Sequence, residues 1–161
     1  MFYRSRQDGF SLVEAVIGIA LILLALVGLF VAYSFYLKVG LRAATSLQAA
    51  FLAEEGMEAA RLLRDGAWSN LSSLATATPY YLSWGGGVWS ATTTAVLVDN
   101  NFTRTIVFDD VYRRNGDKDI VATTSPDAKT FDPDIKKVTV SVSAPGVLAR
   151  LATYLANIYT P

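Results

Sequence analysis

The chain has 161 residues, of which 52% are hydrophobic, and its 14 basic and 14 acidic side chains balance to a formal net charge of zero. The absence of histidine and cysteine excludes Ser-His-Asp and Cys-His nucleophiles, thiolate or imidazole metal sites and disulfide bonds. The balanced charge argues against capture of bulk nucleic acid, and no paired-carboxylate or nucleophile motif indicates an enzyme.

The hydrophobic residues are concentrated in one segment near the N-terminus. Residues 10–37 include 23 hydrophobic side chains, and Glu14 is the only charged residue among them. As a helix this segment is about 42 Å long, which exceeds the ~30 Å hydrocarbon core of a bilayer, so it predicts a membrane-spanning helix. Residues 38–161 have an ordinary globular composition, with about 47% hydrophobic residues. Two basic side chains lie close to each end of the segment, so their count leaves its orientation open.

A short polar leader precedes the apolar segment and ends at Gly9. A secretory signal peptide has a shorter apolar run followed by a small-residue cleavage site, whereas here the change in character comes before the run. Residues 9–14 read Gly-Phe-Ser-Leu-Val-Glu and resemble the class III leader junction of type IV pilins and type II secretion pseudopilins. The resemblance implies that a prepilin peptidase cleaves between Gly9 and Phe10 at the cytoplasmic face and that Phe10 is N-methylated.

Glu14 needs an explanation, because a carboxylate at membrane depth costs a few kcal/mol. It must therefore lie near the interface or be paired. The family resemblance implies the second: Glu14 neutralises the N-terminal amine of Phe10 in a neighbouring subunit as a filament forms. In an apolar helical bundle such a pair sets the register between subunits, since leaving either charge alone is costly.

The chain has no proline before Pro79. Major type IVa pilins usually carry a proline at the twenty-second mature position, where this chain has Val31 when counted from Phe10. This difference predicts an unbroken helix and favours a minor pilin or a pseudopilin. Residues 51–65 also resemble the end of the long helix in PilV-type minor pilins and in the minor pseudopilin I.

Beyond residue 38 the helical pattern becomes amphipathic and predicts a continuous helix to Asp65, with Gly66 as its C-terminal cap. Two apolar stripes suit packing on a sheet and on neighbouring helices: Leu41, Leu52 and Leu63 form one, and Leu47, Phe51 and Leu62 form the other. Arg61 is spaced to pair with Glu58 and with Asp65. The acidic run at residues 54–58 is interpreted as a solvated helix face.

The distal part of the chain predicts strands. A connecting loop is expected at residues 66–79, and strands at 96–98, 102–112 and 135–142. Further signals are a turn at Asn115-Gly116, a polar loop bracketed by Pro126 and Pro133, and a hairpin break at residues 144–146. Leu148–Tyr159 fits either a helix or a strand, and the pilin resemblance favours a strand.

Two further features have alternative interpretations. Residues 84–89 read Trp-Gly-Gly-Gly-Val-Trp, which lacks the Lys-Ser/Thr of a phosphate loop and predicts a glycine turn between strands, with an exposed aromatic ligand patch as the alternative. Acidic residues gather in the distal half, at Asp109, Asp110, Asp117, Asp119, Asp127, Asp132 and Asp134. They suit loop geometry, with a calcium site as the less favoured alternative. We expect no other cofactor.

These observations predict an α+β, pilin-like fold with a long N-terminal helix packed on a small antiparallel sheet. The expected organisation is a cleaved leader (1–9), a transmembrane or filament-core helix (10–37), its amphipathic continuation (38–65) and a β-rich domain (66–161).

The expected function is a minor pilin that waits in the inner membrane, with its distal domain outside the cytoplasm, and then joins a filament. Its expected partners are the prepilin peptidase, other pilin subunits, an inner-membrane assembly platform and membrane lipid, with no specific nucleic acid. The alternatives are a minor pseudopilin of type II secretion and, from a different class, a membrane-anchored binding domain that never polymerises.

Overall fold

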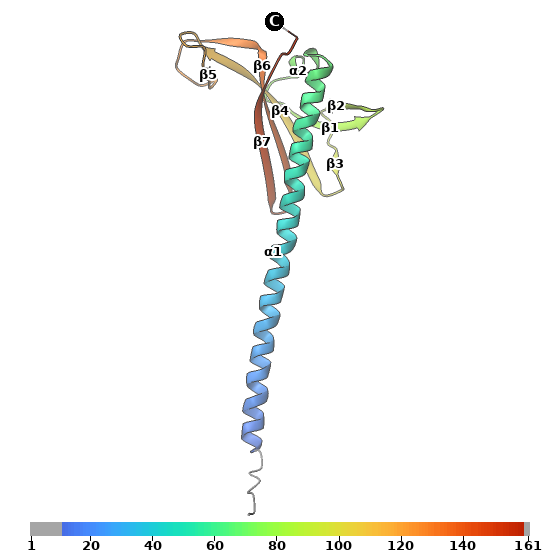
Figure 1. The fold of residues 1–161 in the computed structure, drawn as a ribbon, viewed down its shortest axis with the longest axis vertical. Coiled ribbons are helices and arrows are strands. Elements are labelled where there is room, and N and C mark those ends of the chain that lie inside the picture. The colour runs from blue at the N-terminus through green and yellow to red at the C-terminus, as the bar shows by residue number, and fades with distance from the viewer. Residues whose placement is uncertain (1–10, 160–161) are drawn as a thin grey trace, which may run out of the picture. The chain divides into compact units, whose positions relative to one another are not determined.

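The computed structural model describes residues 11–159, and the chain forms two compact units, Met1–Leu41 and Arg42–Pro161. Helix α1 (Leu12–Gly66) is a single helix of 55 residues (Figure 1). It is rich in alanine and leucine, the best helix formers, and contains no proline to remove a backbone donor. The predicted unbroken helix is therefore confirmed over the described residues.

The C-terminal end of α1 differs from the prediction. Gly66 is the last helical residue and does not have the positive φ of a left-handed cap. The carbonyl of Leu63 instead accepts the backbone N–H of Ala67 at 3.4 Å and the side-chain Nδ2 of Asn70 at 3.0 Å. A side-chain donor thus satisfies the terminal carbonyl, and no left-handed residue is required.

The face of α1 that packs on the core consists mostly of small residues rather than of the predicted leucines. The buried residues are Ala49, Ala53, Gly56, Met57, Ala59 and Ala60. At Gly56 an added Cβ would lie 2.8 Å from Val140 Cγ1. The helix therefore approaches the sheet more closely than a leucine-lined face would allow.

The two predicted leucine stripes flank this face rather than form it. In the first stripe, Leu52 and Leu63 are half-buried against the core, whereas Leu41 is 70% exposed and does not pack on the sheet. The side chains of the second stripe are all exposed: Leu47, Phe51 and Leu62. The leucines lie outside the contact because the small side chains of α1 already fill the narrow space between the helix and the sheet.

The sequence predicts a loop after α1, and the structure shows a short helix there as well. This helix is α2 (Ser69–Ser72), which buries Leu71. Trp68, immediately before α2, donates its indole Nε1–H to the carbonyl of Pro133 at 3.2 Å. Local backbone bonds, such as those from Asn70 N to the carbonyl of Ala67 and from Leu71 N to the carbonyl of Trp68, close this helical turn where composition alone indicated a loop.

In the described part of the chain, seven strands form one antiparallel sheet of order β2-β1-β4-β6-β7, with β3 and β5 also paired to β4 (Figure 1). The strands are β1 (Pro79–Gly85), β2 (Val88–Thr92), β3 (Leu97–Val98), β4 (Phe102–Arg114), β5 (Ile120–Val121), β6 (Lys129–Ala144) and β7 (Val147–Ala156). The three strands predicted between residues 96 and 142 are confirmed as β3, β4 and part of β6. The ambiguous C-terminal segment is a strand over residues 147–156, as the resemblance suggested.

The core lies between α1 and the inward face of the sheet. Alternate residues of the two longest strands are fully or almost fully buried, which confirms the two-residue periodicity read from the sequence. These residues are Phe102, Ile106 and Phe108 on β4 and Val138, Val140 and Val142 on β6. Tyr80 on β1 meets Phe108 edge to face, with ring centroids 6.2 Å apart.

Two predicted glycine turns are confirmed. Gly86 and Gly87 join β1 to β2 with φ values of 60° and 81°, the left-handed geometry that matches the twist of a two-residue hairpin. Gly146 has a φ of 73° and follows Pro145 in the turn between β6 and β7. Proline presets the first turn position and glycine supplies the positive φ at the second.

The predicted loop bracketed by prolines is partly wrong, because β6 begins at Lys129 and includes Pro133. The pairing of β4 with β6 passes from Asp110↔Lys136 to Val111↔Asp132, so the partners shift in register at this point. Pro133 lies within the resulting bulge. A residue without an N–H costs no ladder hydrogen bond there, which explains how the strand accommodates a proline.

Candidate functional site

The beginning of α1 carries the residues that the sequence assigns to maturation and assembly. Gly9 and Phe10 lie outside the described residues, so their roles stay predictions. The carbonyl of Ser11 accepts the N–H of Ala15 at 3.1 Å, which starts the helical ladder. Glu14 lies in the first turn and is exposed. An acid at this position interacts favourably with the unpaired N–H groups of a helix start.

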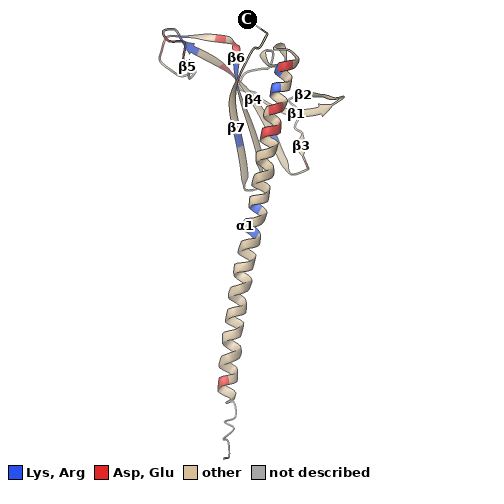
Figure 2. Ribbon diagram, in the orientation of Figure 1, with Lys and Arg blue, Asp and Glu red and all other residues tan. Residues whose placement is uncertain are grey.

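The first part of α1 has an apolar surface. Its large hydrophobic side chains are exposed, with Leu12 at 82% and Phe30 at 71%. Figure 2 shows this part of the helix almost without charge, apart from one acidic position near its start, which the sequence identifies as Glu14. Within the described residues α1 is the one helix long and apolar enough to cross a membrane. Such a surface requires lipid or other apolar helices around it.

A buried cation lies under the second part of α1. Arg104 on β4 is only 4% exposed, and its Nη1 lies 2.9 Å from the Oε2 of Glu55. The same nitrogen is 3.3 Å from the carbonyl of Leu52, and the guanidinium lies 5.2 Å from the ring centroid of Trp89. Among the described residues no hydrogen-bond partner is found for the buried Nε. Glu55 lies on the exposed face that the sequence predicts, with its side chain 47% exposed, and it is also the counterion of a buried group.

The sequence did contain a signal for this pair. Arg104 occupies an inward-facing position between Phe102 and Ile106. Because alternate side chains of a strand face the core, an apolar residue is expected there. A basic residue at such a position needs a counterion, because a buried unpaired charge is costly. The helix supplies Glu55, and the sequence could not indicate which of the neighbouring glutamates would face the strand.

Around the rest of this helix surface the ion pairs only partly follow the prediction. Arg61 pairs with Glu58, as expected from their spacing. Asp65, the other expected partner of Arg61, pairs with Arg64 at 2.8 Å. These contacts are exposed, so each contributes at most a few tenths of a kcal/mol.

A second buried cation, Lys136, is 5% exposed. Its Nζ lies 2.6 Å from the Oδ1 of Asp110. The hydrogen bond from Lys136 lowers the pKa of Asp110 from its ordinary value of 3.8, and this effect outweighs the opposing effect of burial. The pair links β4 to β6 beside the bulge.

Acid should therefore weaken the fold through Asp110. A carboxyl whose folded pKa is lowered contributes stability above its ordinary pKa of 3.8, and that contribution is lost as the pH falls through the lower folded value. We expect Asp110→Asn to flatten the acid limb of the stability curve, measured by urea unfolding of the full chain in detergent. Asp109→Asn is the matched control, because the described residues show no ion pair for Asp109. Its free energy of unfolding should fall with acid as that of the wild type does. An unchanged limb in Asp110→Asn would contradict the assignment.

The distal aspartates are engaged by basic side chains and backbone donors. Arg114 contacts Asp117 at 2.5 Å and Asp127 at 3.0 Å, and both acids hold its pKa above the ordinary value. The pKa of Asp117 is lowered first by the backbone N–H of Asp119 and then by Arg114. In residues 11–159 no group of three acidic side chains is placed to hold a metal ion.

The tryptophans of the β1–β2 hairpin lie beside one another at a small apolar cavity. The ring centroids of Trp84 and Trp89 are 5.2 Å apart, and Trp84 is 58% exposed. The cavity has a volume of about 400 Å³ and is lined mainly by these rings, Val88 and the end of α1. It contains no charged side chain, which agrees with the rejection of a phosphate loop.

Comparison with known proteins bears on the N-terminal segment. Residues 4–30 match the family model described as the prokaryotic N-terminal methylation motif. No curated protein and no solved structure matches the chain. The matched residues include the leader junction and Glu14, and residues 12–30 of the match belong to the exposed apolar part of α1. The chain therefore carries an N-terminal methylation motif of the class III prepilin type at residues 4–30, and the apolar helix that follows supports a membrane-anchored precursor.

Proposed function

We propose that the protein is a minor pilin, a structural subunit that leaves the membrane by joining a pilus filament. The observation that supports this most directly is the methylation motif at residues 4–30 at the start of an unbroken helix. The motif implies processing by prepilin peptidase and assembly with other pilin subunits. The exposed apolar surface of α1 exchanges lipid for neighbouring helices, so its hydrophobic side chains stay out of water in both locations.

Maturation at Gly9 and Phe10 is directly testable by mass spectrometry of the protein isolated from membranes that contain prepilin peptidase. We expect a mature chain that begins at an N-methylated Phe10. Deletion of the peptidase should leave the full precursor in the membrane. An intact Met1 terminus in the presence of an active peptidase would overturn the proposal and favour the non-polymerising, membrane-anchored domain.

Glu14 directs assembly in this proposal. Cleavage creates a positively charged amine at Phe10, and Glu14 is the only acid in the apolar segment. When an incoming subunit places its amine beside Glu14 of a neighbour, both charges are neutralised inside a medium of low dielectric constant. A displaced register leaves both uncompensated, at a cost of several kcal/mol. The pair therefore favours one axial position of the incoming subunit.

We expect Glu14→Ala to insert into the membrane and to be cleaved normally. Its incorporation into filaments should fall at least about tenfold, because a tenfold change corresponds to about 1.4 kcal/mol and an unpaired buried charge costs more than that. The measurement is the ratio of this subunit in sheared filaments to that in membranes. Glu14→Asp keeps the charge and should recover part of the incorporation, whereas Val13→Ala controls for a loss of apolar surface. Normal incorporation of Glu14→Ala would contradict the charge-pairing mechanism.

The choice of a minor pilin over a major one is supported by the absence of a proline kink in α1. A minor pseudopilin has the same leader and an equally straight helix, so it is the alternative within the family. The two differ in location, since a pilus crosses to the cell surface and a pseudopilus stays periplasmic. Immunogold labelling of the distal domain on intact cells is expected to decorate surface filaments. Labelling only after the outer membrane is opened would favour the pseudopilin.

A further inference from the structure

Strand β7 forms a long open edge of the sheet. It pairs with β6 on one side over ten consecutive residue pairs, from Ile135↔Ala156 to Ala144↔Val147, without a shift in register. It is the last strand in the sheet order, so within the described residues its other side has no strand partner. The opposite edge strand, β2, has only five residues. The sheet therefore offers one long and regular backbone edge.

The register shows which backbone groups of β7 are available. The two-residue turn makes Ala144 and Val147 a hydrogen-bonded pair, and such pairs alternate along an antiparallel ladder. At the far end Asn157 donates its N–H to the carbonyl of Asp134 at 2.8 Å, which fits the same alternation. The N–H and C=O groups that point away from β6 belong to Leu148, Arg150, Ala152, Tyr154 and Ala156.

This edge has few of the features that protect most exposed strands. Natural edge strands are blocked by lysine, proline, a bulge or a covering segment. The sequence of β7 contains no proline, lysine or acid. Its one charged residue is Arg150, whose Nε donates to the hydroxyl of Ser141 at 3.2 Å. The exposed side chains along the strand are otherwise apolar, including Leu148 at 65% and Tyr154 at 49%.

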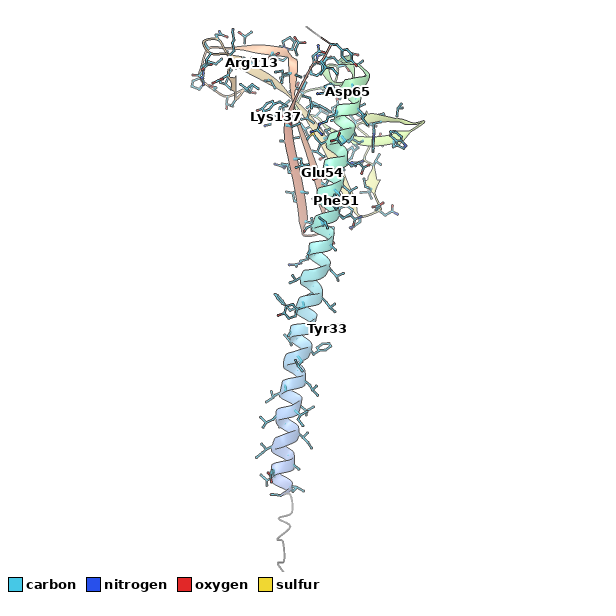
Figure 3. The ribbon with its side chains drawn as sticks, in the orientation of Figure 1. Tyr33, Phe51, Glu54, Asp65, Arg113 and Lys137 are labelled. Carbon is cyan, nitrogen blue, oxygen red and sulfur yellow. The ribbon has the colours of Figure 1, made fainter. Side chains whose placement is uncertain are left out.

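A groove lies between Leu151 of β7 and α1. It has a volume of about 460 Å³, with Leu151 of β7 on one side and residues of α1 on the other. The α1 side includes the apolar Phe51 and Met57 and the acidic Glu54; Figure 3 labels Phe51 and Glu54 on this part of the helix. An open strand edge beside a helix is the arrangement into which an extended peptide can add as a further strand.

The charges in the groove indicate the chemistry of its occupant. Glu55 forms an ion pair with Arg104, and Glu58 forms one with Arg61. Glu54 is exposed, and the described residues show no ion pair for it. A strand entering the groove would therefore gain from a basic side chain placed opposite Glu54, with apolar side chains against Phe51 and Leu151.

We propose that β7 binds an extended segment of another polypeptide, which adds to the sheet as an eighth strand and directs a lysine or arginine at Glu54. The unpaired backbone groups of β7 supply the affinity, and the groove supplies the preference for alternate apolar side chains and one basic residue. The proposal does not depend on the filament function, since neither the leader nor Glu14 takes part in it.

The test uses the full chain in detergent micelles and two fluorescently labelled peptides, Thr-Val-Thr-Lys-Thr-Val-Thr and Thr-Val-Thr-Glu-Thr-Val-Thr. Both peptides are palindromic, so either strand direction presents the same side chains. Fluorescence anisotropy should detect binding of the lysine peptide and at least about tenfold weaker binding of the glutamate peptide. Glu54→Lys should reverse this preference.

The backbone contribution is tested at Ala152, whose N–H points away from β6. Ala152→Pro removes that donor without removing a hydrogen bond to β6, and it should reduce binding of the lysine peptide by at least about tenfold. Ala152→Val keeps the N–H and should bind like wild type. Circular dichroism of each variant confirms that the sheet is intact.

Three outcomes would overturn the proposal. The first is that wild type binds neither peptide, and the second is that folded Ala152→Pro binds as well as Ala152→Val. The third is a concentration-dependent dimer of the full chain that Ala152→Pro abolishes. That result would assign the β7 edge to a second copy of this protein rather than to a different polypeptide.

Discussion

Replacing Gly56 with leucine is expected to destabilise the second unit by about 1–3 kcal/mol. Even the first atom of a side chain at this position would lie 2.8 Å from Val140 Cγ1 and 3.1 Å from Arg104 Cδ. Val140 is fully buried, so it cannot move away without displacing the centre of the core. Leucine is a better helix former than glycine, which opposes the loss, and the steric term must exceed that gain.

Gly40→Leu is the matched control for Gly56→Leu, because it makes the same replacement in α1 where an added Cβ meets nothing within 4 Å. The measurement is urea unfolding of the full chain in detergent, followed by tryptophan fluorescence. All three tryptophans, Trp68, Trp84 and Trp89, belong to the second unit, so the signal reports the packing under test. Equal stability of the two variants would show that the helix and sheet are not in close contact at Gly56.

Removing the carboxylate of Glu55 should have an effect of similar size. Glu55→Ala leaves the guanidinium of Arg104 buried, with one backbone carbonyl and the face of Trp89 as its remaining contacts. We expect a loss of about 1–3 kcal/mol, below the value for a fully buried pair because the Glu55 side chain is 47% exposed. Glu54→Ala is the control and should change stability by less than about 0.5 kcal/mol.

A double variant distinguishes the unpaired charge from a simple loss of contacts. Arg104→Met keeps most of the buried side-chain volume and removes the charge that Glu55 neutralises. The double variant Glu55→Ala, Arg104→Met should therefore be more stable than Glu55→Ala alone. If it is less stable, the contacts of Arg104 with Leu52 and Trp89 stabilise the fold more than the pairing with Glu55 does.

Local chemistry explains why parts of the fold could be predicted. A single long apolar segment can pair all its backbone groups in lipid by itself only as a helix, so the first part of α1 follows from composition. The alternation along β4 and β6, and the glycines at positions 86, 87 and 146, identify strands and turns because each depends on neighbouring residues alone. The assembly roles of Phe10 and Glu14 are instead implied by the family resemblance and stay predictions, although Glu14 stands out as the only charge in residues 10–37.

Other features depend on contacts between residues that are distant in the sequence. The acidic run on α1 contains three glutamates with similar local surroundings, and only the position of Arg104 on β4 makes Glu55 different from Glu54. Pro133 looks like a strand breaker until the bulge opposite Asp110 removes the need for its N–H. Gly66 looks like a helix cap until the side chain of Asn70 takes over that role.

The sequence by itself determined the leader, the apolar helix with its single acid, and the presence of a β-rich second part. The leader rests on its resemblance to a family motif, whereas the helix and the β-rich part rest on composition and on short periodicities, which act within a few residues. The tertiary structure decided which face of α1 packs on the sheet, which glutamate neutralises the buried arginine, and which strand is left at the edge. Those outcomes depend on the distance between packed surfaces, and small residues such as Gly56 set that distance only once helix and sheet are in contact.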